Sequence, residues 1–163
     1  MAETTSCRFF QTSIQFNVTE KNIKKNTTID LPNMDDDVGW CRLCFGNVTT
    51  TAEKETINED GLLPLVSIVC HMSQPLIEQV LDYHLAWFET TGFTEAQGRW
   101  FFALLACLEK PLTPDACSSL RTLVRYCANL RAAIDNDDAR LPPLNLLICL
   151  VTRYFDQFDL ADD

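Results

Sequence analysis

The sequence predicts an all-α protein, a helical bundle of about five helices with a partly disordered amino-terminal segment. Two observations carry this prediction. From residue 62 onward, apolar residues recur at the three-to-four spacing that is typical of amphipathic helices. Glycine is scarce, with 5 in 163 residues, which disfavours a turn-rich β-sandwich and a glycine-rich phosphate loop. Hydrophobic residues make up 47% of the chain, enough to form a core, so disorder of the whole chain is not expected.

Residues 1–60 differ in composition from the rest of the chain. They are rich in Thr and Asn and lack sustained apolar periodicity. We therefore expect a flexible segment, apart from a patch near residues 38–45 where Val38, Trp40, Leu43 and Phe45 are large and apolar. Such a patch is expected to dock on the main body. Residues 61–163 are then expected to form a helical domain.

Capping residues mark where the expected helices begin and end. Ser or Thr precedes three of the helical stretches, with Pro or a Glu–Ala–Gln turn at their first positions. The expected elements are a compact turn or short helix within 62–72 opening at Pro64, a helix after Ser73 that ends at Gly92, one after Thr94 that halts before Pro111, one after Thr113 closed by 136–138, and one opened by Pro142-Pro143 that runs to Phe155.

The last of these helices, from Leu144 to Phe155, is apolar on nearly every side. A helix that is hydrophobic all round is normally surrounded by others. The sequence therefore predicts that this helix is the central rod of the bundle.

The charge balance limits the classes of partner. The chain has 13 Lys and Arg against 23 Asp and Glu, a formal net charge of −10. It lacks the basic footprint of a direct nucleic-acid binder, so we expect protein partners, some of them basic. The amino-terminus has no secretory signal pattern, and no apolar run approaches the length of a membrane span. We expect an intracellular, soluble protein with reduced cysteines and no membrane partner.

The residues that normally carry chemistry are few. Cys41-x-x-Cys44 is half of a zinc motif, and its candidate completions, Cys70, His71 and His84, have none of the usual spacings. His84 lies on an apolar helix face, where we expect a satisfied core or boundary residue rather than a base. No GxGxxG, P-loop or HExxH motif occurs. The sequence predicts a protein that is not an enzyme, with no catalytic residues, no metal and no cofactor.

Arg99 stands out because it precedes Trp100-Phe101-Phe102, in the richest aromatic stretch of the chain. Two interpretations stay open. The guanidinium either extends to the surface beside its aromatic neighbours, or binds an acidic residue of a partner, since Arg and Trp are typical interface anchors.

Several long segments resemble a known family. Gly98-Arg99-Trp100 is followed by ALLACLEKPL (103–112), and the chain continues with PPLNLLICLV (142–151), RYFDQ (153–157) and DLAD (159–162). Together these segments closely resemble the Gemin family, in the branch of the second Gemin, whose members interact with the survival motor neuron protein. The similarity is strong over 93–163, moderate over 61–92 and faint around 36–40. Family members carry a long amino-terminal arm, and residues 1–25 do not match it.

This resemblance implies a non-enzymatic scaffold of the survival motor neuron complex, found in cytoplasm and nucleus, including nuclear bodies. It implies an all-α domain that binds an amphipathic helix from the amino-terminal part of the survival motor neuron protein. The complex holds a partial ring of Sm proteins during spliceosomal snRNP assembly, a step toward mRNA splicing. By analogy Arg99 pairs with a carboxylate of the partner helix. The expected groove walls are Trp100, Phe101, Leu105, Tyr154 and Phe155, each of which fits plain core packing equally well.

Two other functions remain open from the sequence. The chain is either a structural α-helical oligomerisation domain that uses the same groove, or a zinc-dependent protein that uses Cys41 and Cys44.

Overall fold

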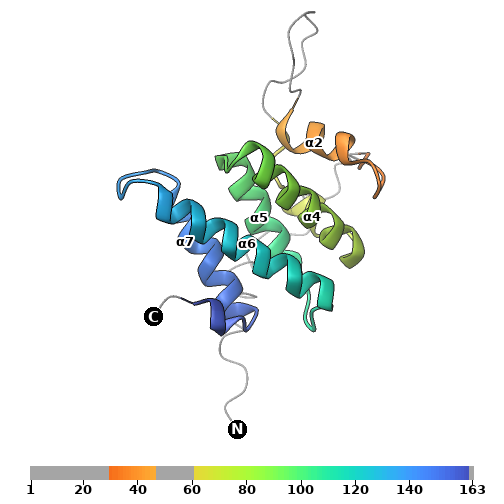
Figure 1. Ribbon diagram of the computed structural model, residues 1–163. Helices are drawn as coiled ribbons and strands as arrows, with labels where there is room; N and C mark the ends of the chain where they lie inside the picture. The colour runs from red at the N-terminus through yellow and green to blue at the C-terminus, as the bar shows by residue number, and fades with distance from the viewer. Residues whose placement is uncertain (1–29, 47–60, 162–163) are drawn as a thin grey trace, which may run out of the picture. The chain divides into compact units, whose positions relative to one another are not determined.

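The structure is a computed structural model in which residues 30–46 and 61–161 are described (Figure 1). The described residues from Leu31 onward belong to one compact unit. All regular elements among them are helical, which confirms the predicted all-α class. They are α2 (Asp37–Phe45), α3 (Val66–Val69), α4 (Gln74–Thr91), α5 (Glu95–Cys107), α6 (Pro114–Ala133), α7 (Leu141–Cys149), the π-helical turn η1 (Leu150–Tyr154) and the 3₁₀ turn η2 (Phe158–Leu160). The predicted division at residue 60 lies outside the described residues and stays a prediction.

Helix α5 is the centre of the bundle. It contacts α2, α3, α4 and α7, whereas α6 packs on α4 and α7 (Figure 1). The inner side chains of α5 are almost completely buried, with Trp100 1% and Phe101 0% exposed. The apolar side chains of α5 therefore pack against several neighbouring helices at once, and this packing fixes the position of α5 in the bundle.

The expectation that the last helix is the central rod is wrong. α7 buries Leu144, Leu147 and Ile148, but Leu146 is 47% exposed and Cys149 on the same side is exposed too. It packs on α5 and α6 and continues directly into the turn η1. The composition of a helix states how much apolar surface it has, but not how many neighbours cover that surface. No described helix, α7 included, has both the length and the apolar content needed to cross a membrane.

The predicted caps at Thr94 and Thr113 are present, whereas Ser73 precedes α4 without a side-chain capping hydrogen bond. The Thr94 hydroxyl accepts a hydrogen bond from the backbone N–H of Gln97 at 3.2 Å, and Thr113 accepts from the N–H of Ala116 at 3.0 Å. At the other end of α4, Gly92 has φ +81°, a left-handed conformation that side chains rarely adopt. These local signals explain why the ends of α4, α5 and α6 follow the sequence closely.

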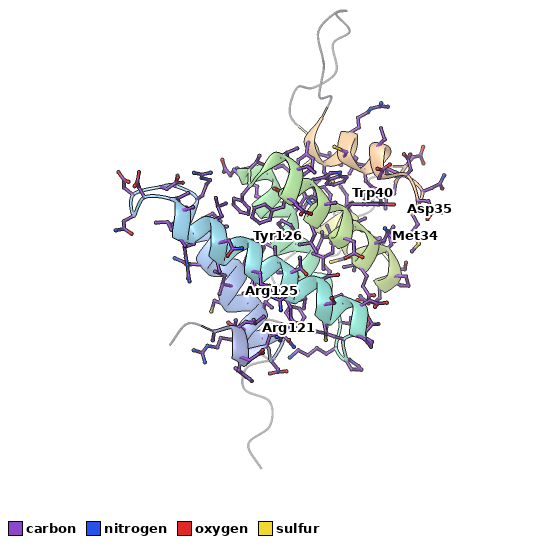
Figure 2. All side chains as sticks on the ribbon, in the orientation of Figure 1. Met34, Asp35, Trp40, Arg121, Arg125 and Tyr126 are labelled. Atoms are coloured by element: carbon purple, nitrogen blue, oxygen red, sulfur yellow. The ribbon has the colours of Figure 1, made fainter. Side chains whose placement is uncertain are left out.

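Within the predicted docking patch, residues 37–45 form the helix α2. The Asp36 carboxylate accepts from the N–H of Gly39 at 2.8 Å and caps its first turn. Trp40 faces the bundle and is completely buried, and its indole N–H donates to the carbonyl of Asn33 at 3.0 Å (Figure 2). Tyr83 on α4 donates its hydroxyl to the carbonyl of Met34 at 2.9 Å. The residue Met34 just before α2 and the buried Trp40 within it therefore attach this segment to the body of the protein.

The carboxyl-terminal turn is attached to α6. Arg121, labelled on the exposed side of α6 in Figure 2, donates two parallel hydrogen bonds to the carboxylate of Asp159, at 3.0 and 2.7 Å. This bidentate geometry is the strong form of an arginine–carboxylate pair. The guanidinium of Arg121 lowers the pKa of Asp159 below its usual value. The turn η2 is thus held against α6 although it buries no residue of its own.

Thr113 gives a test of the capping argument, because its hydroxyl also donates to the Glu78 carboxylate on α4 at 3.0 Å. We expect Thr113→Ala to lower the free energy of unfolding by about 1–2 kcal/mol, since a cap and an interhelix tie are lost together. Thr113→Ser keeps the hydroxyl and is the matched control. Urea denaturation of the two variants measures the difference, and equal losses in both would contradict the capping role.

Candidate partner-binding groove

A groove of about 680 Å³ lies where four segments meet: α2, residues 61–64, the end of α4 and the start of α5. This volume falls within the range of about 300–1,000 Å³ that is usual for binding pockets. Most of its walls are apolar or aromatic. The lining residues are Cys41, Cys44, Phe45, Gly61, Leu62, Leu63, Pro64, Trp87, Thr91, Thr94, Ala96, Gln97, Arg99 and Trp100.

Residues 61–64, here called the strap, form one wall of the groove and are held by both flanking helices. The N–H of Leu62 donates to the carbonyl of Leu43 at 2.7 Å, and the carbonyl of Leu62 accepts the indole N–H of Trp100 at 3.0 Å. Gly61 passes so close to α2 that an added Cβ would lie 2.1 Å from the carbonyl oxygen of Cys44. Only glycine fits this crossing, so the strap is fixed by its backbone.

The helix bundle behind the groove contains a cluster of rings centred on His84 of α4. The His84 ring stacks on Trp100 at a centroid distance of 5.9 Å and meets Trp87 edge-on at 5.0 Å. Phe45 of α2 and Phe101 of α5 close the cluster at 5.3 and 5.5 Å from the same ring. Because Phe45, Trp87 and Trp100 also line the groove, this cluster sets the shape of its walls.

His84 is buried without the hydrogen bonds that such a residue normally has. It is completely buried, and neither ring nitrogen has a partner among the described residues, contrary to the expectation of a satisfied histidine. Burial lowers the pKa of His84 to about 3. Gln97 of α5 lies next to it and donates its side-chain N–H to the His84 carbonyl at 3.0 Å. The Oε1 of Gln97 likewise has no partner in the described part of the chain.

Arg99 lies at the rim of the groove. Its side chain is 50% exposed and forms an ion pair with Glu95, one helical turn earlier on α5. Because a guanidinium carries five N–H donors, the pair with Glu95 leaves capacity for a second carboxylate. Arg99 is therefore placed to bind an acidic group that enters the groove from solvent.

The structure separates the predicted site residues into three places. Arg99 and Trp100 both line the groove, although Trp100 is also a core residue. Phe101 and Leu105 are buried in the interior of the bundle, where they pack as core residues. Tyr154 and Phe155 lie at the other end of the molecule's helical unit, beside Lys110, whose ammonium group is 4.6 Å from the Tyr154 ring centroid. Partner contact by these residues stays a prediction.

The sequence reading missed several groove residues. Phe45, Trp87 and Gln97 line the groove but have no motif around them. The available signal was weak: Trp87 and Thr91 are four residues apart on one face of α4, and Gln97 closes the capping box at Thr94. The contribution of α2 and the strap depends on long-range contacts that periodicity does not encode.

Cys41 and Cys44 both line the groove. Burial raises the pKa of both thiols above the usual range, and Cys44 is 1% exposed. Thiolates, not thiols, bind zinc. Across residues 30–46 and 61–161, no group of three or more Cys, His, Asp or Glu side chains is placed to hold a metal ion. The structure gives the zinc interpretation no support.

Comparisons with known proteins identify the family. A sequence model of the family described as survival motor neuron (SMN) interacting protein 1 (SIP1) matches residues 4–158. The chain belongs to this family. The expectation that residues 1–25 match nothing in the family is therefore wrong, since the match begins at residue 4.

Curated proteins from two vertebrates are similar to this chain. Gem-associated protein 2 of Mus musculus is 45% identical over 154 residues, which cover 88% of this chain and 57% of that protein. Gem-associated protein 2 of Xenopus laevis is 42% identical over 149 residues, covering 84% and 58% of the two chains. The chain thus spans somewhat more than half the length of these relatives.

A solved structure is similar as well. A chain in the structure described as the 8S snRNP assembly intermediate superposes with a TM-score of 0.66 and 25% sequence identity. The superposition covers 96% of this chain and 73% of that chain. The helical fold is therefore shared with a component of that assembly.

The buried His84 predicts a specific pH dependence of stability. Its pKa in the folded protein is about 3, below the ordinary value of about 6.5, so the unfolded state binds more protons below pH 6.5 and stability falls as pH falls. We expect the free energy of unfolding to drop by about 2 kcal/mol between pH 6.5 and 4.5 from this group.

His84→Leu removes the titrating ring and should flatten this pH dependence, which urea denaturation at several pH values measures. His71→Gln, on the surface, is the matched control. A His84→Leu variant with the same slope as the wild type would show that other groups cause the acid sensitivity.

Proposed function

We propose that this chain is a non-enzymatic scaffold of the survival motor neuron complex that acts in spliceosomal snRNP assembly. In this proposal the groove receives an amphipathic helix from the amino-terminal part of the survival motor neuron protein. Membership of the SIP1 family and similarity to a chain of the 8S snRNP assembly intermediate support the proposal. The proposed locations are the cytoplasm and the nucleus, including nuclear bodies.

The observation that carries the proposal is the groove itself. It combines apolar walls, including Phe45, Trp87 and Trp100, with a half-exposed cation, Arg99, at the rim. Helix-in-groove recognition needs an apolar trough for the hydrophobic face of the partner helix. A charge at the rim then fixes the register by pairing with one acidic side chain of that helix.

Sm proteins are the second class of partner in the proposal. The net charge of −10 attracts basic proteins over long range and disfavours direct contact with RNA phosphates. We therefore propose that this chain contacts the protein part of the assembly and that it has no direct nucleic-acid contact.

A peptide titration tests helix binding. We expect a synthetic peptide that covers the amino-terminal helix of the survival motor neuron protein to bind the 163-residue chain with micromolar or tighter affinity, measured by calorimetry. A peptide of the same composition in scrambled order is the control. Absence of binding at micromolar concentration contradicts the proposal. Light scattering that shows a stable self-dimer unable to bind the peptide would favour the oligomerisation domain instead.

Two substitutions at the rim should affect the affinity differently. Arg99→Ala should weaken peptide binding by about 2–5 kcal/mol, because a carboxylate of the partner loses its mate in a desolvated site. Glu95→Gln removes the intrahelix competitor and should leave affinity unchanged or increase it. Arg125→Ala, on the exposed side of α6 (Figure 2), is the matched control. Equal affinities for the Arg99→Ala and wild-type chains would restrict Arg99 to pairing with Glu95.

A further inference from the structure

The thiols of Cys70 and Cys107, which do not line the groove, lie in contact at the carboxyl-terminal end of α5. The Sγ atoms of Cys70 and Cys107 are 3.7 Å apart. Cys70 lies in the turn that follows α3, and Cys107 is the last residue of α5, 37 positions later. Cys70 is exposed to solvent, whereas Cys107 is only partly exposed.

The backbone on both sides of this contact is firmly held. On the α3 side, Ile68, Val69 and Met72 are buried around the exposed Cys70. On the α5 side, the Gln74 side chain donates to the carbonyl of Cys107 at 2.9 Å and accepts from the N–H of Glu109 at 2.9 Å. The closeness of the two sulfur atoms therefore follows from the packing of α3 and α4 against the end of α5.

The two thiols differ in their exposure to solvent. Cys107 is half-buried, and burial together with its contact to Cys70 raises its pKa to about 12, so it keeps its proton at neutral pH. Cys70 is the more exposed of the two sulfurs, so a dissolved oxidant has readier access to it than to Cys107. Once Cys70 is oxidised, the thiol of Cys107 lies 3.7 Å from the oxidised sulfur.

We propose that Cys70 and Cys107 form a reversible disulfide that clasps α3 to the end of α5 when the protein meets hydrogen peroxide. Peroxide first transfers one oxygen atom to the sulfur of Cys70, which gives a sulfenic acid and one water. The sulfur of Cys107 then attacks that of Cys70. The S–S bond forms, the S–O bond breaks, and the hydroxyl leaves with the Cys107 proton as a second water. Two electrons pass from the thiol pair to the peroxide.

The geometry needs only a small adjustment to reach this bond. A disulfide has an S–S length of about 2.05 Å, so the two sulfur atoms, now 3.7 Å apart, must approach by roughly 1.7 Å. Disulfides in intracellular proteins are usually transient and redox-sensing, and this pair is reducible because Cys70 is open to solvent.

The disulfide between Cys70 and Cys107 would restrain the segment that follows the strap. Residues 61–64 form the strap and continue directly into α3 and Cys70. Oxidation therefore ties the downstream end of the strap segment to α5, the helix that carries Trp100 and Arg99. It also closes a loop between positions 70 and 107, which restricts the unfolded chain and stabilises the fold.

The test uses the full 163-residue chain treated with a small excess of hydrogen peroxide and no partner. After free thiols are alkylated, proteolysis and mass spectrometry should find residues 70 and 107 linked, and dithiothreitol should reverse the link. We expect the midpoint of thermal unfolding to rise by about 5–10 °C on oxidation. Hydrogen exchange should slow in residues 68–72.

Three variants make the outcome decisive. Cys70→Ser and Cys107→Ser should each abolish the oxidative rise in the unfolding midpoint. Cys149→Ser, which removes another exposed thiol, should retain it. Because Cys70 is exposed, its variant should fold normally, and circular dichroism checks this. The proposal is overturned if peroxide carries Cys70 to sulfinic acid with Cys107 still alkylatable, or if the midpoint rises equally in Cys70→Ser.

Discussion

The contact on which the rest of the structure depends is that of Trp100 with its surroundings. Its ring is buried on α5 and stacks on His84 of α4, while its indole N–H holds the carbonyl of Leu62. The Trp100 side chain thus joins α4, α5 and the strap. Burial of its ring stabilises the contact, and the hydrogen bond to Leu62 orients the ring. Because Leu62 also donates to the carbonyl of Leu43, this chain of contacts extends to α2. The Trp100 ring and the backbone hydrogen bonds of Leu62 fix the positions of α2, the strap and α5, and the groove lies between these segments.

The region behind the groove keeps polar atoms in an unfavourable state. Both nitrogens of His84 and the Oε1 of Gln97 are buried with no partner among the described residues. Burying a polar group without a hydrogen bond costs about 1–3 kcal/mol, so a site optimised for stability alone would have apolar residues here. The Gln97 side-chain N–H donates to the His84 carbonyl and so joins α5 to α4, while the Oε1 of the same side chain has no partner among the described residues. This cost falls at the wall of the groove, where function rather than packing is expected to set the residues.

The helices were predictable because their signals are local. Thr94 and Thr113 are caps, and Gly92 ends α4, each within four residues of the backbone group that it serves. The groove was not predictable in the same way, since Phe45, Leu62 and Trp87 meet only through long-range packing. The helix from Leu144 shows the same limit: its composition suggested burial on all sides, yet Leu146 faces solvent. Phe101 and Leu105 were singled out for aromatic and apolar character, which a core residue and a groove wall share.

Arg99 shows how a residue can be recognised from its motif while its energetics depend on structure. The resemblance placed it opposite a partner carboxylate, and the geometry puts it at the rim of the groove. The structure adds Glu95, which already holds the guanidinium through an exposed ion pair of the kind worth about 0.3–0.5 kcal/mol on a helix surface. The weak pair with Glu95 orients the Arg99 side chain but competes little with a partner carboxylate for the guanidinium. A partner carboxylate that brings apolar surface with it would exclude water from this pair and strengthen it, so that specificity at the rim and burial in the groove depend on each other.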